Sequence, residues 1–253
     1  MAVMLVYLLE PLGLTMADLP DMGALLQGSA ALLGDQFQVY TRAPLILRQQ
    51  LLFPYVHGLA FVKAALAHGG WPGLQRVYQH PPVSTQQIMH PETYFTETPM
   101  LPDEVTLQVP DGTLNTSWKK LKRDVLGEFL LSVILQQFLS EEEARQSAAG
   151  WRGDRYELFG QQDFGRLLLV CVTAWDTPAE ATAFFQSYHK LLALKYPGWT
   201  TQALEDQSGY LWQQDQTHVL LGLQERLVHI VEGALADEWP RLQTLLEHVT
   251  AVP

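Results

Sequence analysis

The stretch from Leu52 to Tyr94 constrains the fold most, because it holds the clearest helix start and stop signals in the chain. Apolar residues recur there at helical spacing and on more than one face, which predicts a helix that is buried on most of its surface. Pro54 fits the first turn of this helix, where the missing N–H of proline costs nothing. Gly69 and Gly70 end the helix, since glycine accepts the left-handed backbone that a helix end often needs.

Two shorter helices are predicted beyond these glycines. The first spans residues 72–79. The second begins at Ser84, whose pairing with Gln87 three residues later is typical of a capping box. It ends near His90, because Pro91 disfavours helical backbone in the residue before it. This rigid helical frame presents a set of polar and aromatic side chains: Tyr55, His57, His90 and Tyr94.

The residues before this stretch are also predicted to be helical. Helices are expected over residues 12–40 and 43–52, so that residues 1–98 form an all-α region. Residues 1–9 make an apolar helix without a capping residue. Two interpretations of this start are open. Either the helix docks in a core with its first N–H groups bonded elsewhere, or Met1 is an internal methionine and the domain extends upstream.

The second half has the patterns of a sheet covered by helices. Several segments are rich in β-branched and aromatic residues, which is typical of strands: 117–123, 155–160, 166–175, 210–214, 218–224 and 226–233. Helix starts are predicted at Asp124, Ser140, Thr177 and Asp237. Short connections between strands favour antiparallel pairing. We therefore expect an α+β fold, with an N-terminal all-α helical region followed by a mostly antiparallel sheet covered by helices.

A change in composition between the two halves predicts the domain boundary. The segment PMLPDEVTLQVPDG combines prolines and acidic residues with a short apolar alternation. This composition indicates an exposed linker or edge strand over residues 99–116. Residues 1–98 are then the helical region, and residues 117–253 are an α+β domain.

Composition and charge limit the classes of partner. Of the 253 residues, 47% are hydrophobic and 17% are charged, which allows a sizeable core. The net charge of −11 argues against nucleic acid and anionic membranes as partners. No apolar run approaches the roughly 20 residues that span a membrane, so no membrane span is expected. The start lacks the features of a signal peptide, and the chain as written is expected to be cytoplasmic.

The sequence also argues against a metal site. Its single cysteine, Cys171, lies in a continuous apolar run and is predicted to be a buried thiol. A catalytic zinc ion usually needs a closely spaced pair of ligands on one helix. The histidines between residues 52 and 94 are too widely spaced for such a pair. We therefore predict no metal ligands and no cofactor in this chain.

Longer motifs extend over nearly the whole chain. They are FPYVHGLAFVKAALAHGGW, PPVSTQQIMHPETYF, VLGEFLLSVIL, AAGWRGDRYELF and TAWDTPAEATAFF. Together they resemble the part downstream of the zinc site in a family of bacterial metallopeptidase-like proteins of the gluzincin type. The resemblance implies that residues 1–98 are the remnant of a metallopeptidase-like catalytic domain.

The zinc-binding motifs of that family are missing here. They are an HExxH helix and a third, glutamate ligand, which lie upstream of the shared motifs, and zinc is expected only in a longer, exported form. The resemblance also implies that Tyr55, His90 and Tyr94 line the former substrate cleft, where such side chains can stabilise a developing oxyanion. The alternative is structural: His90 caps the preceding helix and the two tyrosines pack against their neighbours.

Three functions remain open at this point. The chain is a truncated or degenerate metallopeptidase-like protein that does not hydrolyse peptides by itself. Alternatively, it is a non-catalytic module that binds a peptide or a protein in the former substrate cleft. In the third case an upstream polypeptide supplies the zinc helix and docks on residues 1–9.

Overall fold

The computed structural model describes Met4, Tyr40 and residues 8–13, 42–161, 165–204 and 208–252. The chain divides into two compact units, Met1–Leu101 and Pro102–Pro253. The described part of the first unit is helical, and the second unit is a mostly antiparallel sheet with helices, so the predicted α+β class is confirmed. The helix predicted over residues 12–40 lies mostly outside the described residues, as does most of the one over residues 1–9.

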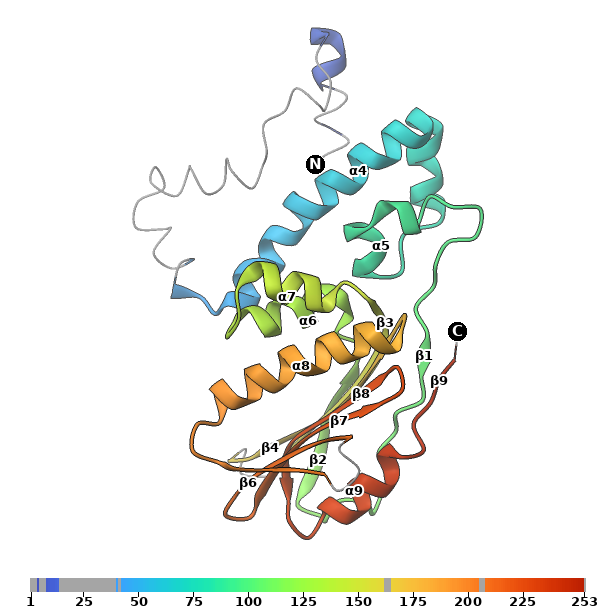
Figure 1. Cartoon of the computed structure of the whole chain (residues 1–253). Helices are drawn as coiled ribbons and strands as arrows, with labels where there is room; N and C mark the ends of the chain where they lie inside the picture. The colour runs from blue at the N-terminus through green and yellow to red at the C-terminus, as the bar shows by residue number, and fades with distance from the viewer. Residues whose placement is uncertain are drawn as a thin grey trace. The chain divides into compact units, whose positions relative to one another are not determined.

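The described part of the first unit is built on one long helix (Figure 1). Its elements are η1 (Glu10–Leu12), α4 (Leu45–Gln79), α5 (Thr85–Met89) and η3 (Pro91–Thr93). Within α4 the backbone leaves helical geometry at Gly69 (φ −152°, ψ 19°) and Gly70 (φ 56°, ψ −150°). A positive φ costs glycine little. The predicted stop at these glycines is confirmed as a kink between two helical parts.

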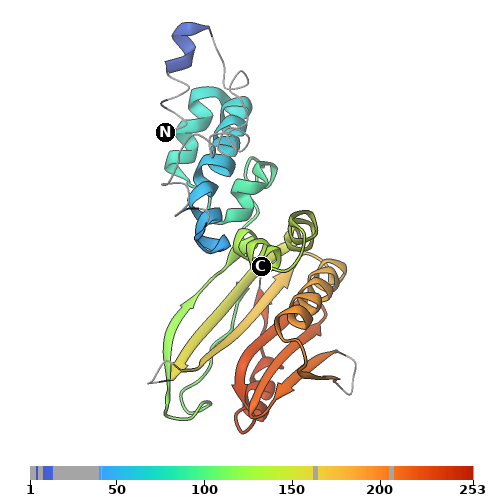
Figure 2. The same ribbon diagram turned by 90° about the vertical axis from the view of Figure 1, so that its left-hand side faces the viewer.

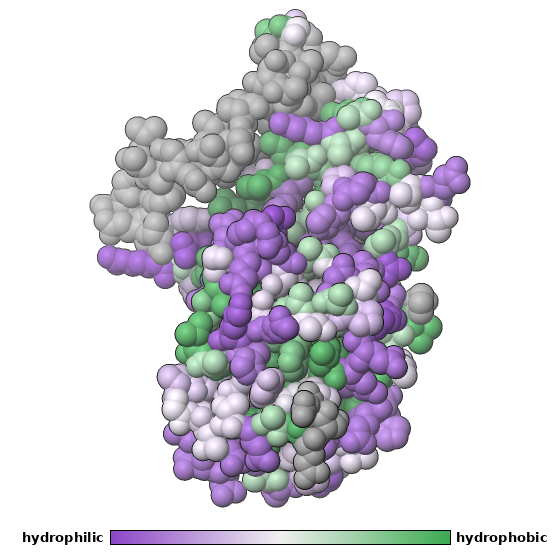
Figure 3. Space-filling model, viewed as in Figure 1, coloured by the Kyte–Doolittle hydropathy of each residue, from purple (hydrophilic) through white to green (hydrophobic). Residues whose placement is uncertain are grey.

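Two other predictions for this helix are wrong. Pro54 does not open it, because α4 begins at Leu45, after Pro44, and Pro54 lies in its interior. The apolar pattern continues on both sides of Pro54, so the helix tolerates the loss of one backbone hydrogen bond. Nor is α4 buried on most of its surface. Its buried residues are Leu59, Phe61, Ala65, Gly73 and Leu74, and Figure 3 shows hydrophobic residues at the surface in the region of α4.

This exposed apolar character has a consequence for the membrane prediction. By length and composition alone, α4 is long and apolar enough to cross a membrane, and 17% of its most apolar window is buried. A single helix of this kind is weak evidence, because the core helices of soluble proteins have the same length and composition. The expectation of no membrane span stays a prediction.

The start of α5 follows its sequence signal. The Ser84 hydroxyl accepts the N–H of Gln87 at 3.2 Å, and the Gln87 side-chain oxygen accepts the N–H of Val83 at 2.7 Å. The Ser84 half of the predicted capping box is thereby confirmed, while the reciprocal bond of Gln87 goes to Val83, one residue before the cap. The helix ends at Met89, and His90 is its C-terminal cap, as Pro91 predicts.

The second unit is organised around one antiparallel sheet. Its elements are β1 (Glu104–Val105), β2 (Trp118–Asp124), α6 (Gly127–Gln136), α7 (Glu141–Ala148), β3 (Trp151–Gln161), β4 (Leu167–Trp175), α8 (Pro178–Lys195), β5 (Thr200–Ala203), β6 (Gly209–Gln214), β7 (Thr217–Gln224), β8 (Leu227–Leu235), α9 (Trp239–Leu246) and β9 (Ala251–Val252). The strand order of the main sheet is β2-β3-β4-β8-β7-β6-β5, and β1 pairs separately with β9.

Helices cover both faces of this sheet (Figure 2). On one face α6, α7 and α8 enclose an apolar cluster centred on Trp151, Trp175 and Phe184. On the other face α9 and the chain around Leu107 enclose a second cluster with Val231. Strand residues alternate between the two clusters because successive side chains point to opposite faces of a sheet. Both faces of the central strands are therefore buried.

Most predicted strands and helices of this unit are present. The strands over 155–160, 166–175, 210–214, 218–224 and 226–233 correspond to β3, β4, β6, β7 and β8. The predicted side-chain caps of α7 and α8 are confirmed, because the hydroxyls of Ser140 and Thr177 accept the N–H groups three residues later. The short strands β5 and β9 were not predicted, whereas β1 lies in the segment expected to be a linker or an edge strand. A strand of two to four residues that lies at a sheet edge carries too little alternation to be recognised from sequence.

The predicted cap of α6 is wrong. Asp124 is the last residue of β2 and does not cap α6. Asp154 does so from β3: its carboxylate accepts the N–H groups of Leu126 at 2.7 Å and Gly127 at 2.8 Å. The carboxylate that caps α6 therefore comes from a residue more than 25 positions later in the chain. The spacing of residues around the start of a helix does not reveal a capping residue on another element.

Candidate functional site

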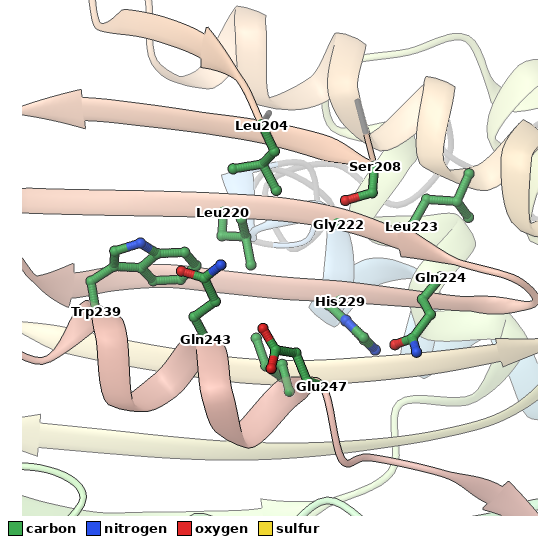
Figure 4. A pocket seen from close by; sticks show the side chains of 11 residues that line it. Leu204, Ser208, Leu220, Gly222, Leu223, Gln224, His229, Trp239, Gln243 and Glu247 are labelled. Atoms are coloured by element: carbon green, nitrogen blue, oxygen red, sulfur yellow. The ribbon is translucent and has the colours of Figure 1, made fainter. Parts of the chain in front are cut away.

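A pocket of about 540 Å³ lies between α9 and the sheet of the second unit (Figure 4). Strands β7 and β8 form its floor, the ends of β5 and β6 form one side, and α9 forms the other. Its apolar lining consists of Leu204, Leu220, Leu223, Leu246 and Trp239 with Gly222, and its polar lining of Ser208, Gln224, His229, Gln243 and Glu247. Its volume lies within the range of small-molecule sites, roughly 300–1,000 Å³.

The strand register explains why there is room for a pocket here. Gly209, Gly222 and His229 lie side by side on β6, β7 and β8. A Cβ placed on Gly222 would meet nothing closer than the His229 side chain, at 3.7 Å. Space that a larger residue would fill is therefore open beside the histidine. The backbone at Gly222 could carry a larger residue, but the side chain of that residue would occupy part of the pocket.

The α9 side of the pocket follows from helical spacing. Trp239, Gln243 and Glu247 recur every four residues, which places them on one face of the helix. Leu242 and Leu246 are buried in the adjacent apolar cluster and fix the helix against the sheet. The helix therefore presents a stripe of one aromatic, one amide and one acidic side chain to the pocket.

His229 is the buried polar group of this site. Its side chain is 6% exposed, and Nε2 has no hydrogen-bond partner among the described residues. Burial lowers the pKa of His229 to about 4 from the ordinary 6.5, so the imidazole is neutral at pH 7. A neutral imidazole offers one donor and one acceptor. The ring thus has hydrogen-bonding capacity that the fold itself does not use.

A second buried polar cluster lies on the opposite face of the sheet and is fully paired. Glu232 accepts hydrogen bonds from the hydroxyls of Tyr188 at 2.8 Å and Tyr196 at 2.6 Å, and it pairs with Lys195 at 2.5 Å. Burial and the adjacent carboxylate raise the pKa of Tyr188. These groups satisfy one another and attach α8 to β8, which is a structural role.

The residues predicted from the resemblance lie in the first unit, and one of them, Tyr94, lines a hollow there. Tyr94 lines a hollow of about 230 Å³ together with His68, Arg76 and His80, and its hydroxyl donates to the backbone oxygen of His80. Its ring packs edge-on against Phe61. Neither Tyr55 nor His90 belongs to the lining of that hollow.

The other two predicted side chains have local contacts. The His90 ring lies 3.6 Å from the Glu92 carboxylate. Burial, and then the neighbouring His90, lower the pKa of His57, so these two histidines are close enough to interact. Tyr55 is 44% exposed on α4. The structure thus brings His57 and His90 together, and the shared cleft of Tyr55, His90 and Tyr94 remains a prediction.

The described residues contain no group of three or more His, Cys, Asp or Glu side chains that could hold a metal ion. Sequence analysis did not single out His229. Its signal is an inward position in the alternation of RLVHIVEG, where an apolar residue would be usual. The pocket also depends on Gly222, which lies on β7 and pairs with His229 on β8. The pairing register of two strands cannot be determined from one sequence.

The fold and pocket define an α+β domain with a concave site between a helix and a sheet. Residues 115–243 match a family described as "Domain of unknown function (DUF8575)", and this match covers about half of the chain. The chain belongs to this family. No curated protein and no solved structure matches it. The matched residues include Gly222 and His229.

Proposed function

We propose that this chain is a non-hydrolytic binding protein and that its ligand, a peptide or the end of a protein chain, occupies the pocket between α9 and the sheet. The observation that carries the proposal is His229: a buried, neutral ring with an unpaired Nε2, beside space left by Gly222. A buried polar group without a partner costs free energy. A ligand that supplies the missing hydrogen bond recovers part of that cost.

The geometry around His229 supports binding more than hydrolysis. A catalytic base is usually oriented by a hydrogen bond from its second nitrogen to a third group. The Nε2 of His229 has no hydrogen-bond partner among the described residues. The lining instead combines apolar surface with a few polar groups, which is the composition of a binding site.

The resemblance to gluzincin-like metallopeptidases supports a second part of the proposal. The chain is a degenerate or truncated relative whose helical region no longer carries the zinc ligands. Metal analysis of the purified protein is expected to find no stoichiometric zinc, and casein is expected to remain intact. Stoichiometric zinc with cleavage that a chelator stops would overturn this part.

Substitution of Gly222 tests the location of the site. A peptide library is screened against the full chain, and the hits are measured with Gly222→Ala and Gly222→Val. The added methyl groups meet no backbone and point into the cavity, so binding is expected to weaken progressively with side-chain size while the thermal midpoint changes little. Thr201→Val on β5 is the control for a β-branched residue outside the lining. Binding that Gly222→Val leaves unchanged would place the ligand elsewhere.

A further inference from the structure

We propose that the ligand group taken by this pocket is a primary ammonium attached to a large apolar group, with Glu247 pairing the ammonium and the leucines and Trp239 holding the apolar group. This inference rests on the proposed binding function and specifies its ligand.

The charges of the pocket select for a cation. Among the described residues of the lining, Glu247 is the one charged side chain, and neither lysine nor arginine contributes. His229 is neutral, so it does not attract an anion. The chain as a whole carries −11. An anionic group such as a carboxylate or phosphate would be repelled, whereas a cation is favoured by both the local and the overall field.

The polar groups also match the donors of an ammonium. A primary ammonium has three N–H donors and no acceptor. The oxygens of Glu247, Gln224 and Gln243 are acceptors, and the unpaired ring of His229 can act as another. In Figure 4 the Glu247, His229 and Gln224 side chains face one end of the pocket. That end can therefore surround an ammonium with acceptors.

The opposite end is mostly apolar, with the amide of Gln243 beside Trp239. Leu204, Leu220 and Trp239 line it in Figure 4, and Leu220 is 5% exposed. Removing an apolar side chain of leucine or phenylalanine size from water contributes about 1.5–3 kcal/mol. An aromatic face can also attract a cation. A ligand with its charge at one end and its apolar body at the other fits this division.

Two sources of this chemistry exist: a free amine and the N-terminus of a peptide whose first residue is large and apolar. The test measures binding to the full chain by calorimetry with four probes: phenethylamine, the peptide Phe-Ala-Ala-amide, its N-acetyl form, and phenylacetate. We expect the peptide to bind, the acetylated peptide and phenylacetate to bind at least about tenfold more weakly, and added salt to reduce peptide affinity. Phenethylamine binding as tightly as the peptide would identify a free amine as sufficient, and peptide binding alone would identify a chain N-terminus.

A second experiment uses the variant Glu247→Gln. Glu247 is exposed at the rim of the pocket, and glutamine keeps the shape of its side chain while removing the charge. The variant is expected to lose about tenfold in affinity for the peptide and to show a smaller salt dependence. Glu141→Gln, an exposed acid on α7, is the matched control and is expected to leave binding unchanged.

The outcomes separate this inference from the proposed function. Equal binding of the free and acetylated peptides, both weakened by Gly222→Val, would overturn the ammonium assignment and leave the binding pocket standing. Absence of any Gly222→Val-sensitive binding, for these probes and for the library, would overturn both.

Discussion

At the scale of single residues, one buried carboxylate joins two elements. Asp154 is 2% exposed and accepts the N–H groups of Leu126 and Gly127 and, at 2.9 Å, the indole N–H of Trp151. It thereby joins β3 to the start of α6. Gly127 has a φ of 75°, which glycine adopts readily. Unpaired buried donors are costly, so the carboxylate stabilises the fold through the groups that it satisfies.

Asp154→Ala is expected to destabilise the protein by about 3 kcal/mol, since it leaves two buried donors and one partly buried donor without an acceptor. Urea unfolding of wild type and variant at pH 7 measures this difference. Asp124→Asn is the control. That carboxylate is exposed and pairs with Lys122 on the surface, where an ion pair contributes at most about 1 kcal/mol. Similar losses for the two variants would contradict the assigned role of Asp154.

His229 makes stability depend on pH. Its pKa is lowered to about 4 in the folded protein, whereas the unfolded chain binds a proton near pH 6.5. The unfolded state therefore gains a proton first as pH falls, and stability is lost between pH 6.5 and 4, by up to about 3 kcal/mol. His229→Gln removes this contribution. Unfolding at pH 7 and pH 4.5 is expected to show a smaller difference for the variant.

His218 is the control residue, because replacing it tests whether the loss of any strand histidine changes the pH dependence of stability. His218 also lies on a strand and has a pKa lowered by burial, yet its ring is partly exposed and does not line the pocket. His218→Gln is expected to alter the pH dependence less than His229→Gln. If wild type and His229→Gln lose the same stability on acidification, the burial of a neutral His229 is not the cause.

At the scale of elements, the three helix starts marked by a serine or threonine cap were predicted correctly. Ser84, Ser140 and Thr177 each accept the N–H of the residue three positions later, as their spacing predicts. In each cap the donor and the acceptor are three residues apart in the chain. Both partners can therefore be recognised from a short stretch of sequence. The start of α6 was mispredicted because its acceptor is Asp154, which comes from a strand later in the chain.

Thr177→Ala is expected to cost about 1 kcal/mol, because it removes the acceptor of the Glu180 N–H at the start of α8. Thr177→Ser retains the hydroxyl and is expected to change the free energy of unfolding by no more than a few tenths of 1 kcal/mol. Thermal unfolding of the three proteins checks both values. Equal midpoints for Thr177→Ala and Thr177→Ser would show that the cap does not limit the stability of α8.

At the scale of the whole molecule, the second unit carries its own core. Both apolar clusters consist of residues between Val105 and Val249. A fragment of residues 102–253 is therefore expected to fold alone, with a cooperative thermal transition and the circular dichroism of an α+β protein. A fragment that remains unfolded would show that the first unit is required.

The family-matched segment alone is expected to be much less stable. Residues 115–243 omit Val105, Leu107, Val109, Leu246 and Val249, which are all buried in the cluster under α9. At about 1.5–3 kcal/mol for each buried aliphatic side chain, their loss is comparable with the whole stability of a typical domain. This shorter fragment is expected to lack a cooperative transition under conditions in which residues 102–253 show one.

The sequence by itself determined the local features of this protein. The α+β class, the main strands of the sheet, the kink at Gly69 and Gly70, and the capping boxes depend on neighbours in the chain and were predicted from it. Tertiary structure decided the rest. It exposes much of α4, supplies Asp154 to α6, and sets Gly222 beside His229 under the stripe formed by Trp239, Gln243 and Glu247. Strand register and helix docking make these contacts between residues far apart in sequence, so the pocket exists only in the folded chain.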